Sequence, residues 1–354
     1  MLHFIFLIDI FFNFSSFKKL FEGNNWLIFL NISFGIGLIS YLVYQSIVHY
    51  INFNKRRING LSSESSSELT DKNEEILAQR EEIERQQAKV KEVLDELTDS
   101  IKTAQRIQQS FLPPDAQINK YLPDHFVLYL PKDIVSGDFY WFHVKYDKIY
   151  IAAVDCTGHG VAGAFMSIIG GNLLKQIVIE NPTHNAAEIL QDLSTDLIRT
   201  LHQDSENAIS NDGMDMSLCI IDIDENIIHF AGANNPLYII RNTELVQIQC
   251  DKRSIGLQKN LRPFEFNNHV MEILQGDKYY MFSDGFASQF GGVNGGEKLK
   301  FNRFREILLK TAHLPFLQQR TAIYAELKLW QNTTEQTDDI MLIGFSVPLN
   351  EEEW

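Results

Sequence analysis

Cysteine is scarce in this sequence of 354 residues, which holds only Cys156, Cys219 and Cys250. The three lack the CxxC pairs of zinc sites and the even number of a disulfide framework, so we expect reduced thiols in a cytosolic domain. A cysteine-dependent phosphatase also needs an arginine six residues after its cysteine. An alanine, a glutamate and a glycine stand at those positions, which excludes that class of enzyme.

Basic residues are also in the minority, with 31 Lys and Arg against 46 Asp and Glu and a formal net charge of −15. No large basic face can form, which argues against nucleic acid as a partner. No GxxxxGK[ST] loop is present to bind a nucleotide. A nucleotide cyclase would need base- and ribose-recognition motifs that are absent. The excess of carboxylates is better suited to a site that binds cations.

Charge is absent altogether from Trp26 to Val48. Roughly 20 apolar residues cross a bilayer as a helix, so this run predicts a transmembrane helix at residues 26–48, with a buried soluble helix as the alternative. Lys55, Arg56 and Arg57 follow directly. The positive-inside rule then places the rest of the chain in the cytoplasm, anchored to the inner (cytoplasmic) membrane.

Residues 1–25 form a hydrophobic segment whose topology the sequence leaves open. The run LHFIFLIDIFFNF carries Asp9 in its middle and has no basic start, so it is a poor signal peptide. It can be a second short span, an interfacial helix or the remnant of an extracellular sensor. The chain accordingly crosses the membrane once or twice.

Proline and glycine are absent from residues 61–112, which predicts one long helix that ends at Pro113 and Pro114. An apolar residue recurs every seven positions, at Leu69, Ile76, Ile83, Val90, Leu97, Ala104 and Phe111. The second seam row is mostly polar, so we expect a homodimeric coiled coil of modest stability, with a single solvated spacer helix as the alternative. A sensor histidine kinase shares this layout, but no histidine lies between Ile51 and Leu112 and no glycine-rich ATP lid follows.

Residues 113–348 contain short β-rich runs separated by turns and a few helical segments. Many antiparallel strands with long helices inserted between them predict an α+β sandwich with the helices outside the sheets. We expect strands at 125–130, 136–144, 148–155, 215–222, 227–233, 236–241, 245–249, 269–273, 277–284 and 339–347. We expect helices at 162–180, 185–203, 302–311 and 317–331.

Aspartates stand at the ends of several of these strands. Asp138 lies in SGDFYW, Asp155 in DCTGHG, Asp284 in FSDGF, and Asp338 with Asp339 in QTDDIMLIGF. Hard divalent cations prefer oxygen ligands, so strand ends that converge would make a metal site. A single Asp beside Gly is more often a turn residue, and it is the joint pattern that favours a metal site.

These motifs, in this order, resemble the SpoIIE/RsbU-type serine phosphatases, the bacterial branch of the metal-dependent protein phosphatase 2C-like family. The resemblance covers about residues 100–348 and includes DGMDMSLCIID and AGANNPLYIIR. It implies a four-layer αββα fold and two Mn²⁺ or Mg²⁺ ions per domain. Two such ions clamp phosphoryl oxygens and activate water, so no nucleophilic side chain is required.

The resemblance also implies roles for individual residues. Asp155 would bridge the two ions, the Cys156 backbone carbonyl and Asp138 would complete one of them, and Asp284 with Asp338 would hold the other. Asp339 and Asp215 are further candidate ligands, Asp215 for a third ion, although Asp212 and Asp215 in NDGMDMS equally suit a turn and a strand start.

Two residues are candidates for handling phosphate and protons. Lys132 stands near the first metal motif, where eukaryotic relatives use an arginine, and it can attract phosphate without gripping it at two points. His159 is a candidate general acid, with a role in pinning its own glycine-flanked loop as the alternative.

The resemblance therefore implies a membrane-anchored serine/threonine phosphatase that acts on a regulatory phosphoprotein, in particular a STAS-domain anti-anti-sigma-like partner. We expect the helix at 61–112 to couple dimerisation to the metal site. The alternative is a catalytically inert membrane scaffold with the same fold. Intact aspartates in all four motifs argue against the scaffold.

Overall fold

The computed structural model describes residues 25–181, 185–205, 210–256 and 264–348. The hydrophobic segment 1–25 lies almost wholly outside the described residues. The chain divides into two compact units, residues 1–92 and 93–354, which are described separately below.

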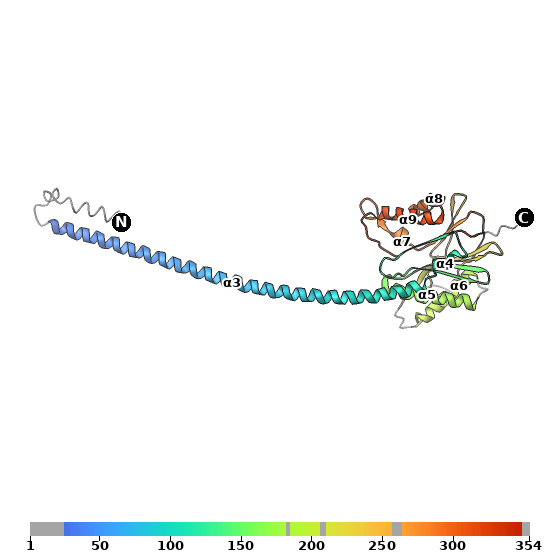
Figure 1. Ribbon diagram of the computed structural model, residues 1–354, viewed down its shortest axis with the longest axis horizontal. Coiled ribbons are helices and arrows are strands. Elements are labelled where there is room, and N and C mark those ends of the chain that lie inside the picture. Colours follow the sequence, from blue (N-terminus) through green and yellow to red (C-terminus); the bar gives the residue numbers. More distant parts are fainter. Residues whose placement is uncertain (1–24, 182–184, 206–209, 257–263, 349–354) are drawn as a thin grey trace. The chain divides into compact units, whose positions relative to one another are not determined.

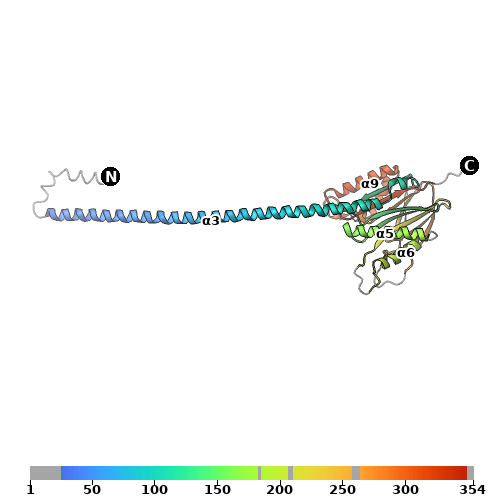
Figure 2. The ribbon, with the colours of Figure 1, turned by 60° about the horizontal axis from the view of Figure 1, so that its bottom comes forward.

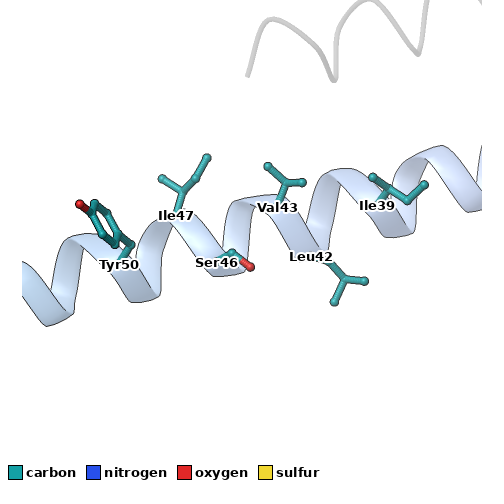
Figure 3. Close-up of a pocket in the computed structure, with 6 residues that line it drawn as sticks. All are labelled: Ile39, Leu42, Val43, Ser46, Ile47 and Tyr50. Atoms are coloured by element: carbon teal, nitrogen blue, oxygen red, sulfur yellow. The ribbon is translucent and has the colours of Figure 1, made fainter.

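Helix α3 (Asn25–Phe111) begins the described chain, and it contributes to both units. It includes both predicted helices and also the residues between them, Gly60 among them. Within the first unit its surface around Ile39, Leu42 and Tyr50 is open and apolar (Figure 3). Such an open surface does not suit the binding of a small molecule, which needs an enclosed cavity.

Two helices of the described chain are long and apolar enough to cross a membrane. In the first, the apolar stretch at the start of α3, no residue is buried. In the second, α5 (Gly160–Glu180), half of the apolar stretch is buried, and Leu174, Ile177 and Val178 belong to the core of the second unit. The apolar character of α5 is thus explained by packing within the domain.

Two five-stranded antiparallel sheets make up the second unit. One has the order β1-β12-β9-β6-β7 and the other β2-β3-β4-β5-β8. The strands of the first are β1 (His125–Leu130), β12 (Ile340–Phe345), β9 (Lys278–Phe282), β6 (Leu237–Arg241) and β7 (Glu244–Ile248). Those of the second are β2 (Phe139–Lys145), β3 (Lys148–Cys156), β4 (Met214–Asp222), β5 (Ile227–Ala233) and β8 (His269–Glu272).

Helices cover the outer face of each sheet (Figures 1 and 2). Helices α5 and α6 (Ala186–Thr200) pack on the β2-β3-β4-β5-β8 sheet, and α8 (Lys300–Thr311) and α9 (Phe316–Gln331) pack on the other. The remaining elements are short: α4 (Asp115–Asn119), α7 (Gly285–Ser288) and the hairpin of β10 (Phe290–Gly291) with β11 (Glu297–Lys298).

Alternation along the strands creates the layers. In β3, Tyr150, Ala152 and Val154 face the helices, and their neighbours Ile149, Ile151 and Ala153 face the opposite sheet. Because side chains of a strand point to opposite faces in turn, a strand that is apolar on both faces must lie between two layers. The structure confirms the predicted four-layer αββα sandwich.

Candidate metal centre

The sheet topology brings the predicted aspartates to one edge of the sandwich. In one sheet, Asp138 directly precedes β2 and Asp155 lies near the end of β3, the antiparallel neighbour of β2. In the other sheet, Asp284 lies just beyond the end of β9, and Asp338 lies just before the start of β12. Neighbouring antiparallel strands end and begin at the same edge, so each sheet contributes two carboxylates there.

Asp138 is the most buried of these four carboxylates, at 2% exposure. Its Oδ2 atom has no hydrogen-bond partner among the described residues. Burial raises the pKa of this carboxyl well above its usual range, and the charge of Asp155 raises it further, although a hydrogen bond with Ser283 opposes both. A buried oxygen without a partner is costly unless another group or a cation satisfies it.

Asp155 shares this environment. Burial raises its pKa from 3.8 to about 7, and the charges of Asp284, Asp338 and Asp215 add to the effect. Burial and the charge of Asp338 likewise raise the pKa of Asp284. The carboxylates therefore lie within electrostatic reach of one another, and Asp138, Asp155 and Asp284 resist ionisation because of burial first and neighbouring charges second.

The acidic groups form an open cluster rather than a finished cage. Within the described segments, no three His, Cys, Asp or Glu side chains already surround a single point closely enough to hold a metal ion. Asp284 and Asp338 are exposed to solvent at the rim, whereas Asp138 is buried beneath them. Mg²⁺ usually keeps several water ligands and takes only one or two carboxylates directly, so an open, oxygen-only cluster fits such an ion.

Asp339 is occupied by the backbone. Its Oδ1 accepts a hydrogen bond from the Lys132 N–H at 2.7 Å, and its Oδ2 accepts one from the Gly137 N–H at 2.8 Å. The side chain is 3% exposed. These bonds tie the segment before β2 to the start of β12, so Asp339 holds the loop that carries Asp138.

Three segments meet at this edge with no side chain between them. A Cβ added to Gly137 would lie 2.4 Å from the carbonyl oxygen of Gly158 and 3.3 Å from that of Cys156. One added to Gly163 would lie 2.6 Å from the Cα of Gly137. The Cys156 carbonyl thus faces the Asp138 loop, as its predicted role requires. Burial raises the pKa of the Cys156 thiol, which stays protonated.

His159 and Lys132 lie in the two loops that flank the cluster. His159 Nδ1 is 2.8 Å from Asp133 Oδ2, and both side chains are about half exposed. This contact orients the imidazole at the start of α5, and no pattern in the sequence indicates it. Lys132 is partly buried, and its backbone N–H is held by Asp339.

Asp215 lies opposite Asp155 in the pairing of β3 with β4. Its Oδ1 accepts a hydrogen bond from the side-chain amide of Asn234 at 2.9 Å. Asn234 adopts a positive φ of 59°, a conformation in which asparagine is enriched among residues other than glycine. Asp212 accepts hydrogen bonds from Thr157 and Ser210, so it joins the β3–α5 loop to the start of β4.

Two further residues near the cluster, Ser283 and Lys298, were not predicted from the sequence. Ser283 bonds to Asp138, and the charge of Lys298 lowers the pKa of Asp284. Lys298 lies on β11, paired with Phe290 on β10, and its Nζ is 5.6 Å from the centre of the Phe290 ring. The hairpin therefore brings the charge of Lys298 within electrostatic reach of Asp284. In the sequence, the one available signal is a lysine that follows the FSDGF motif.

Comparisons with known proteins agree with the fold. The family model for Stage II sporulation protein E (SpoIIE) matches residues 145–348, which include Asp155, Asp284 and Asp338. The SiaA-PP2C domain of Pseudomonas aeruginosa is 30% identical, with a TM-score of 0.65 over 72% of this chain and 99% of that chain. The PP2C phosphatase domain, with a fragment of the regulatory domain, of the cell fate determinant SpoIIE from Bacillus subtilis is 19% identical. Its TM-score is 0.51 over 64% of this chain and 62% of that chain, which shows the fold alone. No curated protein matches the chain.

Proposed function

The chain belongs to the SpoIIE family of PP2C-type phosphoprotein phosphatases, and from this premise we propose that it hydrolyses phosphoserine or phosphothreonine on a regulatory protein with the help of two divalent ions. The observation that carries the proposal is the acidic cluster at the edge of the sandwich. Asp138 Oδ2 is buried and has no hydrogen-bond partner among the described residues, and the carboxyls of Asp138 and Asp155 resist ionisation. A bound divalent cation would satisfy this oxygen and stabilise the ionised carboxylates.

We assign the oxygen atoms of the cluster to the two ions as follows. Asp155 would be shared by both ions, Asp138 and the Cys156 carbonyl would complete one, and Asp284 with Asp338 would hold the other. When bound, Mn²⁺ or Mg²⁺ ions neutralise phosphoryl oxygens and lower the pKa of a coordinated water. Asp215 remains a candidate for a third ion.

The residues around the cluster have supporting roles. Asp339 is assigned to the support of the Asp138 loop, because both of its oxygens already accept backbone N–H groups. His159, oriented by Asp133, would give a proton to the departing serine oxygen. Lys132 and Lys298 are the cations that we assign to attracting the phosphate of the substrate.

The partner is proposed to be a folded phosphoprotein of the STAS-domain type, as the family resemblance implies. Asp284 and Asp338 are exposed at the rim, so the cluster is open to a protein surface. Lysine attracts phosphate as a point charge and lacks the bidentate grip of arginine. Selectivity would then come from contacts between the two proteins rather than from the phosphate alone.

Membrane anchoring and dimerisation are proposed from α3. The uncharged run at its start is long enough to cross a bilayer, with the phosphatase domain on the cytoplasmic side. The heptad residues Leu69, Ile76, Ile83, Val90 and Leu97 are each between 49% and 60% exposed. Such an apolar row on a solvated helix is covered when a second copy of the helix pairs with it, which makes a homodimer.

Hydrolysis of a phosphate ester tests the proposal directly. The full-length chain, purified in detergent, is expected to hydrolyse a chromogenic aryl phosphate and a phosphoserine peptide when Mn²⁺ is added, and to lose that activity in EDTA. Asp155→Asn serves as the matched control because it removes one charge and keeps the shape. An inert scaffold predicts no metal-dependent turnover in either protein, and equal turnover in both would refute the assigned role of Asp155.

A further inference from the structure

Gln289, which directly follows α7, is fully buried, and both ends of its side-chain amide are hydrogen-bonded. Its Nε2 donates to the backbone carbonyls of Phe290 at 2.8 Å and Glu335 at 2.9 Å. Its Oε1 accepts from the Thr337 N–H at 3.3 Å. A buried amide is kept only where its hydrogen bonds are made, so one side chain joins the segment after α7 to the segment before β12.

Each of these two segments carries one of the exposed carboxylates at the rim of the cluster. Asp284 directly precedes α7, and Asp338 lies just before β12. The start of α7 also touches the second segment, because a Cβ added to Gly285 would overlap the carbonyl oxygen of Asp339. The separation of the two carboxylates is therefore set by the backbone contact of Gly285 and by the hydrogen bonds of Gln289.

A second glutamine holds the Asp338 segment from its other side. Gln336 Nε2 donates to the Leu130 carbonyl, at the end of β1, at 2.7 Å and to the Asp338 carbonyl at 2.9 Å. This segment is irregular, so side-chain amides bind backbone groups that a strand would bind through its neighbours. The backbone leading to Asp338 is thus held between the end of β1 and the end of α7.

The backbone carbonyl of Gln289 makes separate contacts. It accepts hydrogen bonds from the Leu299 N–H at 3.0 Å and from the indole N–H of Trp330 at 3.1 Å. Leu299 directly follows Lys298, so these bonds hold the end of the β10–β11 hairpin. Replacing the Gln289 side chain removes neither of them, and it acts on the link between the two rim segments.

We propose that Gln289 is a positioning residue that sets the separation of Asp284 and Asp338, and with it the affinity for the ion assigned to these two carboxylates. This inference rests on the proposed function, since that function places a divalent ion there. Like charges at the rim repel one another when no cation lies between them, so the link between their segments opposes their separation. Groups that orient metal ligands typically change metal affinity or activity by about 10- to 100-fold when they are removed.

Mn²⁺ binding to the full-length chain in detergent provides the test, monitored by the electron paramagnetic resonance signal of free Mn²⁺. Gln289→Ala is expected to weaken the binding of one of the two ions by about 10- to 100-fold. Gln319→Ala is the matched control and should stay within about twofold of the wild type. Gln319 is also fully buried, and its amide bonds to the Tyr280 hydroxyl and the Leu314 carbonyl, each at 2.8 Å, beside the α8–α9 connection.

The Mn²⁺ dependence of turnover separates positioning from general damage. Phosphatase activity of Gln289→Ala is expected to fall at limiting Mn²⁺ and to recover at saturating Mn²⁺, because the ligands themselves are intact. Activity that stays low at every Mn²⁺ concentration, with Mn²⁺ affinity unchanged, would show a purely structural role and overturn the inference.

A second variant reaches the same segment from the β1 side. Gln336→Ala removes the hydrogen bonds to the Leu130 and Asp338 carbonyls at a position that is only partly buried. It is expected to weaken Mn²⁺ binding in the same direction, and it decides the matter if Gln289→Ala does not fold. Equal Mn²⁺ affinity in Gln289→Ala and Gln319→Ala overturns this inference alone, provided the wild type binds Mn²⁺ and hydrolyses phosphate. A wild type that does neither overturns the proposed function as well.

Discussion

Replacing Asp155 by asparagine is expected to make the metal-free protein more stable while it abolishes catalysis. Asp155 is surrounded by other carboxyls, and its pKa is raised from 3.8 to about 7, first by burial and then by the charges of Asp284 and Asp338. Ionising it in the absence of a metal therefore costs free energy. Asparagine keeps the shape and carries no charge, so the cost disappears together with the proposed bridging ligand.

The size of the effect follows from the pKa shift. The pKa of Asp155 rises from 3.8 to about 7, and each tenfold change in proton affinity corresponds to about 1.36 kcal/mol, which gives an upper limit of about 4 kcal/mol. The native state binds the Asp155 proton more tightly than the unfolded state does. The free energy of unfolding of the metal-free wild type therefore falls as pH rises from about 4 to about 7, and this loss is complete above pH 7.

Thermal unfolding in EDTA measures this difference. At pH 8 we expect Asp155→Asn to be more stable than the wild type by about 2–4 kcal/mol, or roughly 5–15 °C in Tm for a domain of this size. Below about pH 4 the two proteins should unfold at nearly the same temperature, because Asp155 is then mostly protonated in both the native and the unfolded wild type. Adding Mn²⁺ should raise the Tm of the wild type and have little effect on the variant.

One outcome would refute this reasoning. If Asp155→Asn is less stable than the wild type in EDTA at pH 8, the ionised Asp155 does not destabilise the metal-free protein. The acidic cluster then has no electrostatic cost that a bound cation would offset. An equal Mn²⁺-induced rise in Tm for both proteins would place the metal elsewhere. Both comparisons use the full-length chain, so the contributions of the detergent and of the apolar N-terminal helix to Tm are the same in the wild type and the variant.

Three further substitutions test the surroundings of the site and the helix. Asp339→Ala leaves the N–H groups of Lys132 and Gly137 without their acceptor and should destabilise the chain by about 2–4 kcal/mol in urea unfolding; a loss below about 0.5 kcal/mol would contradict the clamp. Lys298→Ala should raise KM for a phosphopeptide about two- to fivefold with kcat unchanged, whereas a change in kcat alone would remove Lys298 from substrate attraction. Ile83→Asp places a charge in the exposed heptad row and should convert a dimer to a monomer by light scattering; a persisting dimer would show that another surface pairs.

Most of the fold was predictable from local pattern. The strands at 125–130, 148–155 and 227–233 lie within one residue of β1, β3 and β5, because β-branched and aromatic runs between turn residues are strong local signals. The short elements α4, α7 and the β10–β11 hairpin were not predicted, since two to five residues carry no usable periodicity.

The candidate site was predictable as a set of residues but not as a geometry. The motifs of Asp138, Asp155 and Asp284 identify carboxylates at strand ends, and the sheets bring them to one edge. The hydrogen bonds of Asp339 with the N–H groups of Lys132 and Gly137 join residues 207 and 202 positions apart. The hydrogen bonds from the Gln108 side chain to Ser136 and Ser167 join residues 28 and 59 positions apart. Partnerships at such separations depend on strand order and on helix docking, which no local pattern specifies.

The close contact of Gly137 with Gly158 and Gly163 bears on the size of ion that the site can accept. Backbone atoms touch there, so the separation of the Asp138 loop from the β3–α5 loop is limited by van der Waals radii and not by side-chain choice. Any side chain at Gly137 or Gly163 would push the two loops apart and widen the space between Asp138 and Asp155. Larger ions such as Ca²⁺, which bind at 2.3–2.6 Å rather than 2.0–2.1 Å, would require that wider space. We therefore expect the glycine contact to favour small divalent ions over Ca²⁺.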